Sequence, residues 1–374
     1  MSTLRSVSAF RSPDPLVESF VLSGGWSKSG NSATASLLQR LGVNTASALV
    51  AQTSLPEVTT GWEGGASMRM LRGRISADVA VYADRSTNLF LPDATLTRTG
   101  VVSNSGVEAS VTVIPVRTAD DLEWSVEGNF AHNANRVDSV SAGLTSIPLG
   151  PGFTNVSIVA RTGQPLGTLV GTRFLRDSRG VLLLRDGLPL ADTVAGPVVL
   201  GASAPRWTGG IASTIRKSLV SFSVLLDARQ GGKIFSASNR AGAVSGVLAE
   251  TAFRPDSGYL LSGVDVASSS PNIKHVSAED YYHALGAIAE RWVYDASYVK
   301  LREARLTLAL PLQFVPGVRA QSARLSLIGR NLRTWSNVPN IDPETVLSTS
   351  TFQGAELGQL PSARTLGLQL SLTP

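Results

Sequence analysis

Several kinds of residue are scarce in this chain, and each scarcity excludes a class of structure. None of the 374 residues is cysteine, so disulfide bridges and thiolate metal sites are excluded. Only 16% of the residues are charged and 6% are aromatic. No uncharged apolar run reaches the ~18 residues that a membrane-spanning helix requires. The most apolar stretches, Val220–Leu226 and Leu306–Leu312, have the length of strands.

Apolar residues are nevertheless abundant. They make up 43% of the chain, and the mean hydropathy is +0.12. A transmembrane barrel combines these features, because its apolar residues occur at every second position and not in long runs. A soluble β-protein rich in Gly, Ser and Thr would have a similar composition. Composition therefore leaves both classes open.

The net charge of +5 comes mainly from arginine, which is spread along the chain without a basic block. A nucleic-acid surface requires clustered Lys and Arg with interleaved aromatic residues. We therefore expect no nucleic-acid partner, and we interpret the arginines as residues of solvated loops and of a polar interior.

Apolar and polar residues alternate along many segments. Side chains two residues apart share one face of a strand, so each such segment has an apolar and a polar side. Leu122, Trp124 and Val126, for example, alternate with Glu123 and Ser125. The same pattern occurs in segments 62–70, 74–81, 107–113, 220–226, 323–327 and 366–372. All of these segments are predicted strands.

Connections between the predicted strands fall into two length classes. The short ones are 71–74, 117–120, 216–218 and 311–320, and the long ones are 27–57, 85–104, 229–295 and 332–362. Loops of this length are uncommon inside compact soluble domains. Short periplasmic turns that alternate with long extracellular loops are typical of outer-membrane barrels. The expected fold is an all-β, antiparallel transmembrane barrel segment whose apolar side faces outer-membrane lipid.

Ten strands are predicted from these patterns. If turns and loops alternate strictly, Val17–Trp26 runs outward and Arg364–Thr373 runs inward, which leaves both ends periplasmic. Segment Asn133–Pro205 contains a predicted hairpin, Leu166–Phe174 with Val181–Leu184. Whether this hairpin crosses the membrane or stands in an outer loop is open, so the expected count is ten or twelve.

The longest connection, 229–295, is predicted to be an extracellular loop with one short helix. Ser277 caps this helix, Asp280 completes an S-x-x-D capping box, and Tyr281 to Arg291 are compatible with helix. Aromatic and arginine side chains can stack on and hydrogen-bond a sugar or peptide. The candidate ligand-binding residues of this loop are Arg240, Tyr281, Tyr282 and Trp292. The alternative is that they pack the loop against itself.

Motifs of catalysis are not found. G-x-S-x-G, P-loop, G-x-G-x-x-G and H-E-x-x-H patterns do not occur. The three histidines, at positions 132, 275 and 283, are far apart in the sequence. Asp177–Gly180 and Asp186-Gly187 begin like calcium loops but lack the later carboxylates, and are interpreted as turns. We expect no catalytic residue, no metal site and no cofactor.

The order of local patterns resembles the C-terminal barrel of SusC/RagA-type TonB-dependent outer-membrane transporters. Pieces similar to that family include LSGGWSKSGN at 22–31, NSGVEASV at 104–111, LEWSVEGNFAHNANRV at 122–137, LSLIGRNLRTWS at 325–336, DPE at 342–344 and PSARTLGLQLSLT at 361–373. Each piece alone is weak, but together they follow the order of the family. By the same resemblance, Asn331 and Asp342–Glu344 are interpreted as loop-ordering residues.

The resemblance implies more than the chain contains. Members of the family have a signal peptide, a segment that contacts TonB, a plug domain and a closed barrel of 22 strands. Met1–Phe20 has no apolar core of a signal peptide, because Arg5, Arg11, Pro13 and Pro15 interrupt it. We therefore expect residues 1–374 to be a single partial barrel domain, truncated relative to the family, and Met1 not to be the natural start.

The expected function is that of a receptor and transporter. In its complete form the protein would import a large glycan- or peptide-like nutrient across the outer membrane, beneath a SusD-type lipoprotein and energised by TonB. One alternative is a non-transporting remnant of a truncated or mis-started gene. Others are an outer-membrane barrel enzyme and a soluble carbohydrate-binding β-protein.

Overall fold

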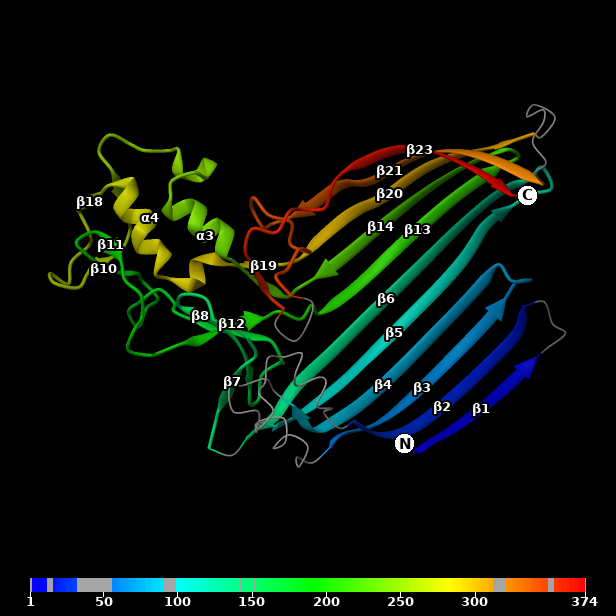
Figure 1. Cartoon of the computed structure of the whole chain (residues 1–374), viewed down its shortest axis with the longest axis horizontal. Coiled ribbons are helices and arrows are strands. Elements are labelled where there is room, and N and C mark those ends of the chain that lie inside the picture. The colour runs from blue at the N-terminus through cyan, green and yellow to red at the C-terminus, as the bar shows by residue number, and fades with distance from the viewer. Residues whose placement is uncertain are drawn as a thin grey trace, which may run out of the picture.

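A computed structural model gives the fold of the chain. It describes residues 2–11, 16–31, 56–90, 99–141, 143–150, 152–311, 321–348 and 353–373. A large curved sheet of long strands forms one part, and a body of short strands and helices lies beyond one end of these strands (Figure 1). We call this second part the loop-end body; it consists mainly of residues 141–206 and 231–297.

Eleven antiparallel strands form the large sheet, each beside its nearest long neighbour in the chain. Ten of them correspond to the ten strands predicted from the sequence, and β1 is additional. The predicted hairpin of 166–184 does not join this sheet, and the eleven strands in the described residues lie within the expected range of about ten to twelve. The strands, in sheet order, are β1 (Ser2–Arg11), β2 (Val17–Asn31), β3 (Glu57–Met70), β4 (Ile75–Phe90), β5 (Thr99–Arg117), β6 (Leu122–Val140), β13 (Trp207–Lys217), β14 (Val220–Gln230), β20 (Tyr298–Leu310), β21 (Ser322–Ser336) and β23 (Thr365–Thr373).

The short and long connections lie at opposite ends of the strands. Connections 71–74, 118–121 and 218–219 lie at what we call the turn end, and the long connections 141–206 and 231–297 lie at the loop end. Because β1 adds one crossing before β2, the two ends of the chain lie at opposite ends of the sheet (Figure 1). The prediction that both ends lie on the same side is wrong for this reason.

The two faces of the sheet differ as the alternation predicted. On the apolar face, Val79 lies opposite Ala66 and Ala109 on the neighbouring strands. This face has no second layer along the middle of the strands, and Val111 is 42% exposed there. On the polar face, the side chain of Asn104 donates to the Asp84 carboxylate at 3.1 Å. Tyr82 donates to Asn133 on the same face, also at 3.1 Å.

The sheet has two free edges and does not close into a barrel within the described residues. β1 pairs only with β2, along all ten of its residues from Ser2 to Arg11, and β23 pairs only with β21. Val17–Trp26 is therefore an interior strand.

Short elements make up the loop-end body, in four small sheets beside two α-helices and two 3₁₀ helices. The strands are β7 (Ser146–Pro148), β8 (Val156–Arg161), β9 (Thr168–Gly171), β10 (Leu183–Arg185), β11 (Leu188–Pro189), β12 (Val198–Ala202), β15 (Lys233–Ser236), β16 (Tyr259–Leu260), β17 (Val264–Asp265), β18 (His275–Val276), β19 (Val293–Asp295) and β22 (Ala355–Glu356). The helices are α3 (Ala237–Val244), η1 (Ala249–Thr251), α4 (Ala278–Gly286) and η2 (Ala289–Trp292). None of the helices in the described ranges is long and apolar enough to cross a membrane.

The predicted helix is α4, and its start is as expected. The Ser277 side chain accepts a hydrogen bond from the Asp280 backbone N–H at 3.0 Å, and the Ser277 hydroxyl donates to the Asp280 carboxylate at 2.7 Å. The helix ends at Gly286 rather than continuing to Arg291, and the residues that follow turn into η2. A second helix, α3, begins at Ala237 and is capped by Ser236, whose side chain accepts from the Asn239 N–H.

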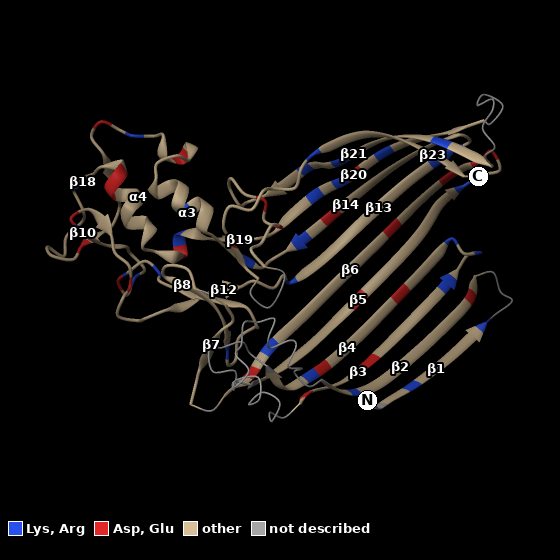
Figure 2. Ribbon diagram, in the orientation of Figure 1, with Lys and Arg blue, Asp and Glu red and all other residues tan. Residues whose placement is uncertain are grey.

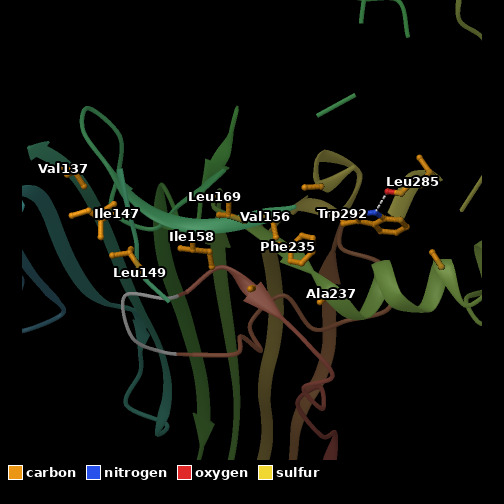
Figure 3. Packing of buried hydrophobic residues seen from close by; sticks show 14 of the residues in the cluster. Val137, Ile147, Leu149, Val156, Ile158, Leu169, Phe235, Ala237, Leu285 and Trp292 are labelled. Atoms are coloured by element: carbon orange, nitrogen blue, oxygen red, sulfur yellow. Dashed lines mark hydrogen bonds between the residues drawn. The ribbon is translucent and has the colours of Figure 1, made fainter. Parts of the chain in front are cut away.

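The main buried cluster joins the two long connections. Ile158 and Leu169 come from 141–206, Phe235 and Trp292 come from 231–297, and all four side chains are at most 1% exposed. Figure 3 shows these side chains following one another along the loop-end body, from Ile158 and Leu169 through Phe235 to Trp292, which lies beside Leu285. Val102 and Val137, at the loop ends of β5 and β6, belong to the same cluster. The two connections are therefore one packed unit seated on the end of the sheet.

Candidate ligand-binding site at the loop end

The four candidate residues proposed from the sequence lie in α3, α4 and η2, and they differ in burial.

Trp292 and Tyr282 belong to the buried cluster. Trp292 is fully buried, and its indole Nε1–H donates to the backbone carbonyl of Leu285 at 2.9 Å. Tyr282 is 8% exposed, and its hydroxyl donates to the backbone carbonyl of Glu250 at 2.8 Å. Burial raises the pKa of Tyr282 to about 12. For these two residues the geometry supports the packing role that the sequence left open.

Arg240 connects the two helices. Its guanidinium Nε–H donates to the backbone carbonyl of Gly286, the last residue of α4, at 2.7 Å. The last carbonyls of a helix lack partners within the helix, so this bond satisfies one of them. A Cβ atom at Gly286 would lie 2.7 Å from a methyl group of Val244, so α3 and α4 approach closely here. Arg240 thus holds α3 against α4.

Tyr281 belongs to a row of aromatic rings that reaches the surface. We call Phe253, Tyr259, Tyr281 and Tyr282 the aromatic stack; its successive ring centroids are 6.1, 5.0 and 5.1 Å apart. Tyr282 is the buried member and Phe253, 68% exposed, is the outermost. Burial raises the pKa of Tyr281 above its ordinary value, as it does for Tyr282. The exposed members of the stack present aromatic ring surface that a ligand could contact.

A cluster of charged side chains lies where the sheet meets the loop end. Lys300, on β20, donates to both carboxylate oxygens of Asp342 at 2.6 and 2.9 Å and to Glu344 at 2.7 Å. The Lys300 side chain is 2% exposed. Arg302, two residues further along β20, bonds Glu344 through two nitrogens and also pairs with Asp227 of β14. We call these five side chains the mouth cluster.

Hydrogen bonding keeps the two loop carboxylates of the mouth cluster ionised. Burial opposes ionisation of Asp342, but hydrogen bonds from Lys300 and from the Glu344 N–H outweigh it and hold the pKa of Asp342 below its usual value. The Arg302 guanidinium chiefly lowers the pKa of Glu344. Each carboxylate thus ties the connection 337–364 to β20. This agrees with the loop-ordering role expected of Asp342–Glu344.

Asn331 has a related role. Its backbone φ is +50°, in the left-handed region that asparagine tolerates better than most residues. Its side-chain amide donates to the backbone carbonyl of Ala363 at 3.0 Å, which links β21 to the segment before β23. Sequence reasoning missed the partner residues Lys300 and Arg302. Their spacing of two on one strand, which places both on one face, was the available signal.

The remaining polar motifs are structural in the described residues. A ring N–H of His132 donates to the backbone carbonyl of Arg206. The Asp177 carboxylate accepts from the backbone N–H groups of Arg179 and Val181, both at 2.9 Å, which confirms the predicted turn. Within the described ranges, no group of three or more His, Asp or Glu side chains is arranged to hold a metal ion.

Comparison with known proteins agrees with this architecture. No family model matches the chain. TonB-dependent receptor P3 of Formosa agariphila is 23% identical over 346 residues, which cover 82% of this chain and 33% of the receptor. TonB-dependent receptor P26 of the same organism is 24% identical over 373 residues, which cover 85% of this chain and 34% of the receptor. The chain thus spans about a third of the length of these relatives.

Solved structures share the fold. The RagAB peptide transporter superposes with a TM-score of 0.67 at 14% identity, over 99% of this chain and 43% of that chain. The RagAB peptide importer in its open-open state gives a TM-score of 0.65 at 14% identity, over 99% and 42%. The fold is that of an antiparallel barrel segment. The resemblance to the barrel of SusC/RagA-type TonB-dependent receptors is thereby confirmed.

Proposed function

We propose that this chain forms part of the barrel of an outer-membrane receptor and transporter, which in its complete form imports a large peptide- or glycan-like nutrient. The supporting observation is the difference between the apolar and the polar face of the large sheet. An apolar face without a second layer suits contact with lipid, and a hydrogen-bonded polar face suits an aqueous lumen. The relatives in sequence are receptors rather than enzymes.

The loop end would face the outside of the cell. Outer-membrane barrels place their long connections there and their short turns in the periplasm. In this orientation the loop-end body stands over the mouth of the barrel, where a nutrient would first be met. A SusD-type lipoprotein would cover the same end, and residues outside this chain would contact TonB.

Ligand contact would fall to the surface members of the aromatic stack. Among the four residues proposed from the sequence, Tyr281 and Tyr282 belong to this stack, and of these two only Tyr281 is half-buried rather than buried. Tyr282, Trp292 and Arg240 would support Tyr281 from the interior of the loop-end body. Replacing Phe253 and Tyr281 by Ala should weaken binding of fluorescent oligopeptides or oligosaccharides to intact cells. Val247→Ala, at an equally exposed apolar residue of the same connection, is the control. Equal binding by both variants would remove the stack from the site.

Orientation can be tested by labelling, because this chain has no cysteine of its own. In a cysteine-free form of the complete protein, Ile273→Cys at the loop end should react with a membrane-impermeant maleimide on intact cells. Arg72→Cys at the turn end should react only after the outer membrane is permeabilised. The reverse pattern would contradict the proposed orientation.

Transport is tested separately by uptake. Cells with the complete protein should accumulate a labelled oligopeptide or oligosaccharide pool that cells without it do not, and an uncoupler should abolish the difference. Uptake that persists with the uncoupler would indicate a passive pore. No uptake of either pool, with the protein present in the outer membrane, would favour a non-transporting barrel.

A further inference from the structure

Cationic side chains line up across the apolar face near the loop end. Strand register places Lys28 of β2 opposite Thr60 of β3, and Thr60 opposite Arg85 of β4. Arg85 in turn lies opposite Ser103 of β5, and Ser103 opposite Arg136 of β6. One lateral row thus carries a cation on every second strand, with a hydroxyl between. We call it the cation row.

An aromatic row lies two residues closer to the turn end on the same face. Its register runs from Trp26 through Trp62, Ala83 and Ser105 to Ala134. Trp26 and Trp62 are 43% and 53% exposed. Aromatic side chains at this position of a barrel strand mark the boundary between hydrocarbon and headgroups.

The two rows enclose a hollow in the surface. It has a volume of about 470 Å³, and its lining includes Trp62, Ala83, Arg85, Ser105, Ala134 and Arg136. Its lining thus combines the small side chains of Ala83, Ser105 and Ala134 with tryptophans and arginines. Arg85 and Arg136 lie two strands apart, which is about 10 Å at the usual strand spacing.

Cations outnumber carboxylates around the hollow: Lys28, Arg85 and Arg136 lie there with Asp138 and with Asp84, which is part of the lining and accepts from Asn104. Asp138 accepts from the Ser103 hydroxyl at 2.7 Å and lies 3.6 Å from Arg85. The Arg85 side chain remains 61% exposed. Arg136 is exposed, and neither it nor Lys28 has an ion-pair partner within the described residues. Figure 2 shows cationic segments at the loop ends of β4 and β6.

We propose that this hollow binds the phosphate-bearing headgroup of a membrane lipid, with Arg85 and Arg136 on the phosphate and the acyl chains along the apolar face. The inference rests on the proposed outer-membrane location. Arginine binds phosphate through paired N–H groups. Tryptophans of membrane proteins are enriched at the depth of the lipid headgroups, which is where the hollow would lie. A water-soluble partner would have to cover the neighbouring apolar band, whereas a lipid matches both the cations and that band.

The test compares three forms of the complete protein: unaltered, Arg85→Gln with Arg136→Gln, and Arg11→Gln with Arg69→Gln. The control pair removes the same charge from the polar face near the turn end, where neither arginine has an ion-pair partner in the described ranges. Each form is purified in neutral detergent and titrated with phosphatidylglycerol or phosphatidylcholine, and bound lipid is counted by native mass spectrometry.

We expect the Arg85/Arg136 variant to bind phosphatidylglycerol about thirtyfold more weakly than the unaltered protein, and Arg136→Gln alone about fivefold more weakly. The control pair should bind as the unaltered protein does. Equal binding by all forms, or complete displacement of the lipid by inorganic phosphate, would overturn the proposal. Outer-membrane fractionation is measured in parallel; absence of the unaltered protein from that fraction would refute the proposed location itself.

Discussion

The large sheet and the loop-end body keep their apolar side chains in opposite places. In the sheet, residues such as Trp62 and Val111 are about half exposed on a face that has no second layer. In the loop-end body, Trp292, Phe235 and Leu169 are at most 1% exposed and pack on one another. A barrel strand relies on lipid to cover its apolar side, whereas the connections must build a core of their own. One chain therefore follows two folding rules.

The largest effect is expected from truncating the core tryptophan. Trp292→Ala should destabilise the loop-end body by about 3–5 kcal/mol, because it leaves a large cavity and removes the indole hydrogen bond to the Leu285 carbonyl. Trp62→Ala, on the apolar face, should leave that body unchanged. Hydrogen exchange of segments 156–171 and 278–292 measures the difference, and equal protection in the two variants would contradict the comparison.

The sheet should respond to charge rather than to truncation. Replacing Val111 or Val126 by Arg should lower the free energy of unfolding by about 2–4 kcal/mol near the bilayer midplane. Replacing Ser110 or Ser125 by Arg should change it little, because those residues face the polar side. Folding into liposomes, followed against denaturant, gives the free energies. If the two series behave alike, the assignment of the faces is wrong.

Acid should loosen the mouth cluster before it affects the core. The pKa values of Asp342 and Glu344 lie below their ordinary values of 3.8 and 4.5. Their stabilisation is therefore fully present above about pH 4.5 and is lost as the pH falls through the lower, folded-state values. Hydrogen exchange of segment 337–348 should rise in that acidic range only. Asp342→Asn should raise it already at neutral pH, and an unchanged profile would argue against the cluster's role.

The smallest effect is expected at the cap of α4. Ser277→Ala should cost about 1 kcal/mol, because the Asp280 N–H loses its acceptor. Ser269→Ala, in the same connection, serves as the control. The cost should appear as faster exchange at the first turn of α4, and no difference between the variants would show that the cap contributes nothing.

The sheet could be predicted from the sequence because apolar and polar residues alternate along a strand, which shows which side chains lie on each face. Ten of the eleven long strands follow from alternation together with the lengths of the connections, and only β1 was missed. Its alternation is weak, since Leu4 lies on one face and Val7 on the other, both well exposed. The start of α4 was also readable, because its cap involves residues three apart. Its end was not, since the turn into η2 depends on packing.

What the sequence determined by itself is therefore local: the period of two, the turns and the cap. Tertiary structure decided which side chains meet across long separations. Lys300 and Asp342 are 42 positions apart, and Arg85 and Arg136 share a row only through the register of three strands. Trp292 could have been a surface ligand contact or a core residue, because an aromatic ring suits both. Only the packing of two distant connections against each other placed it in the core.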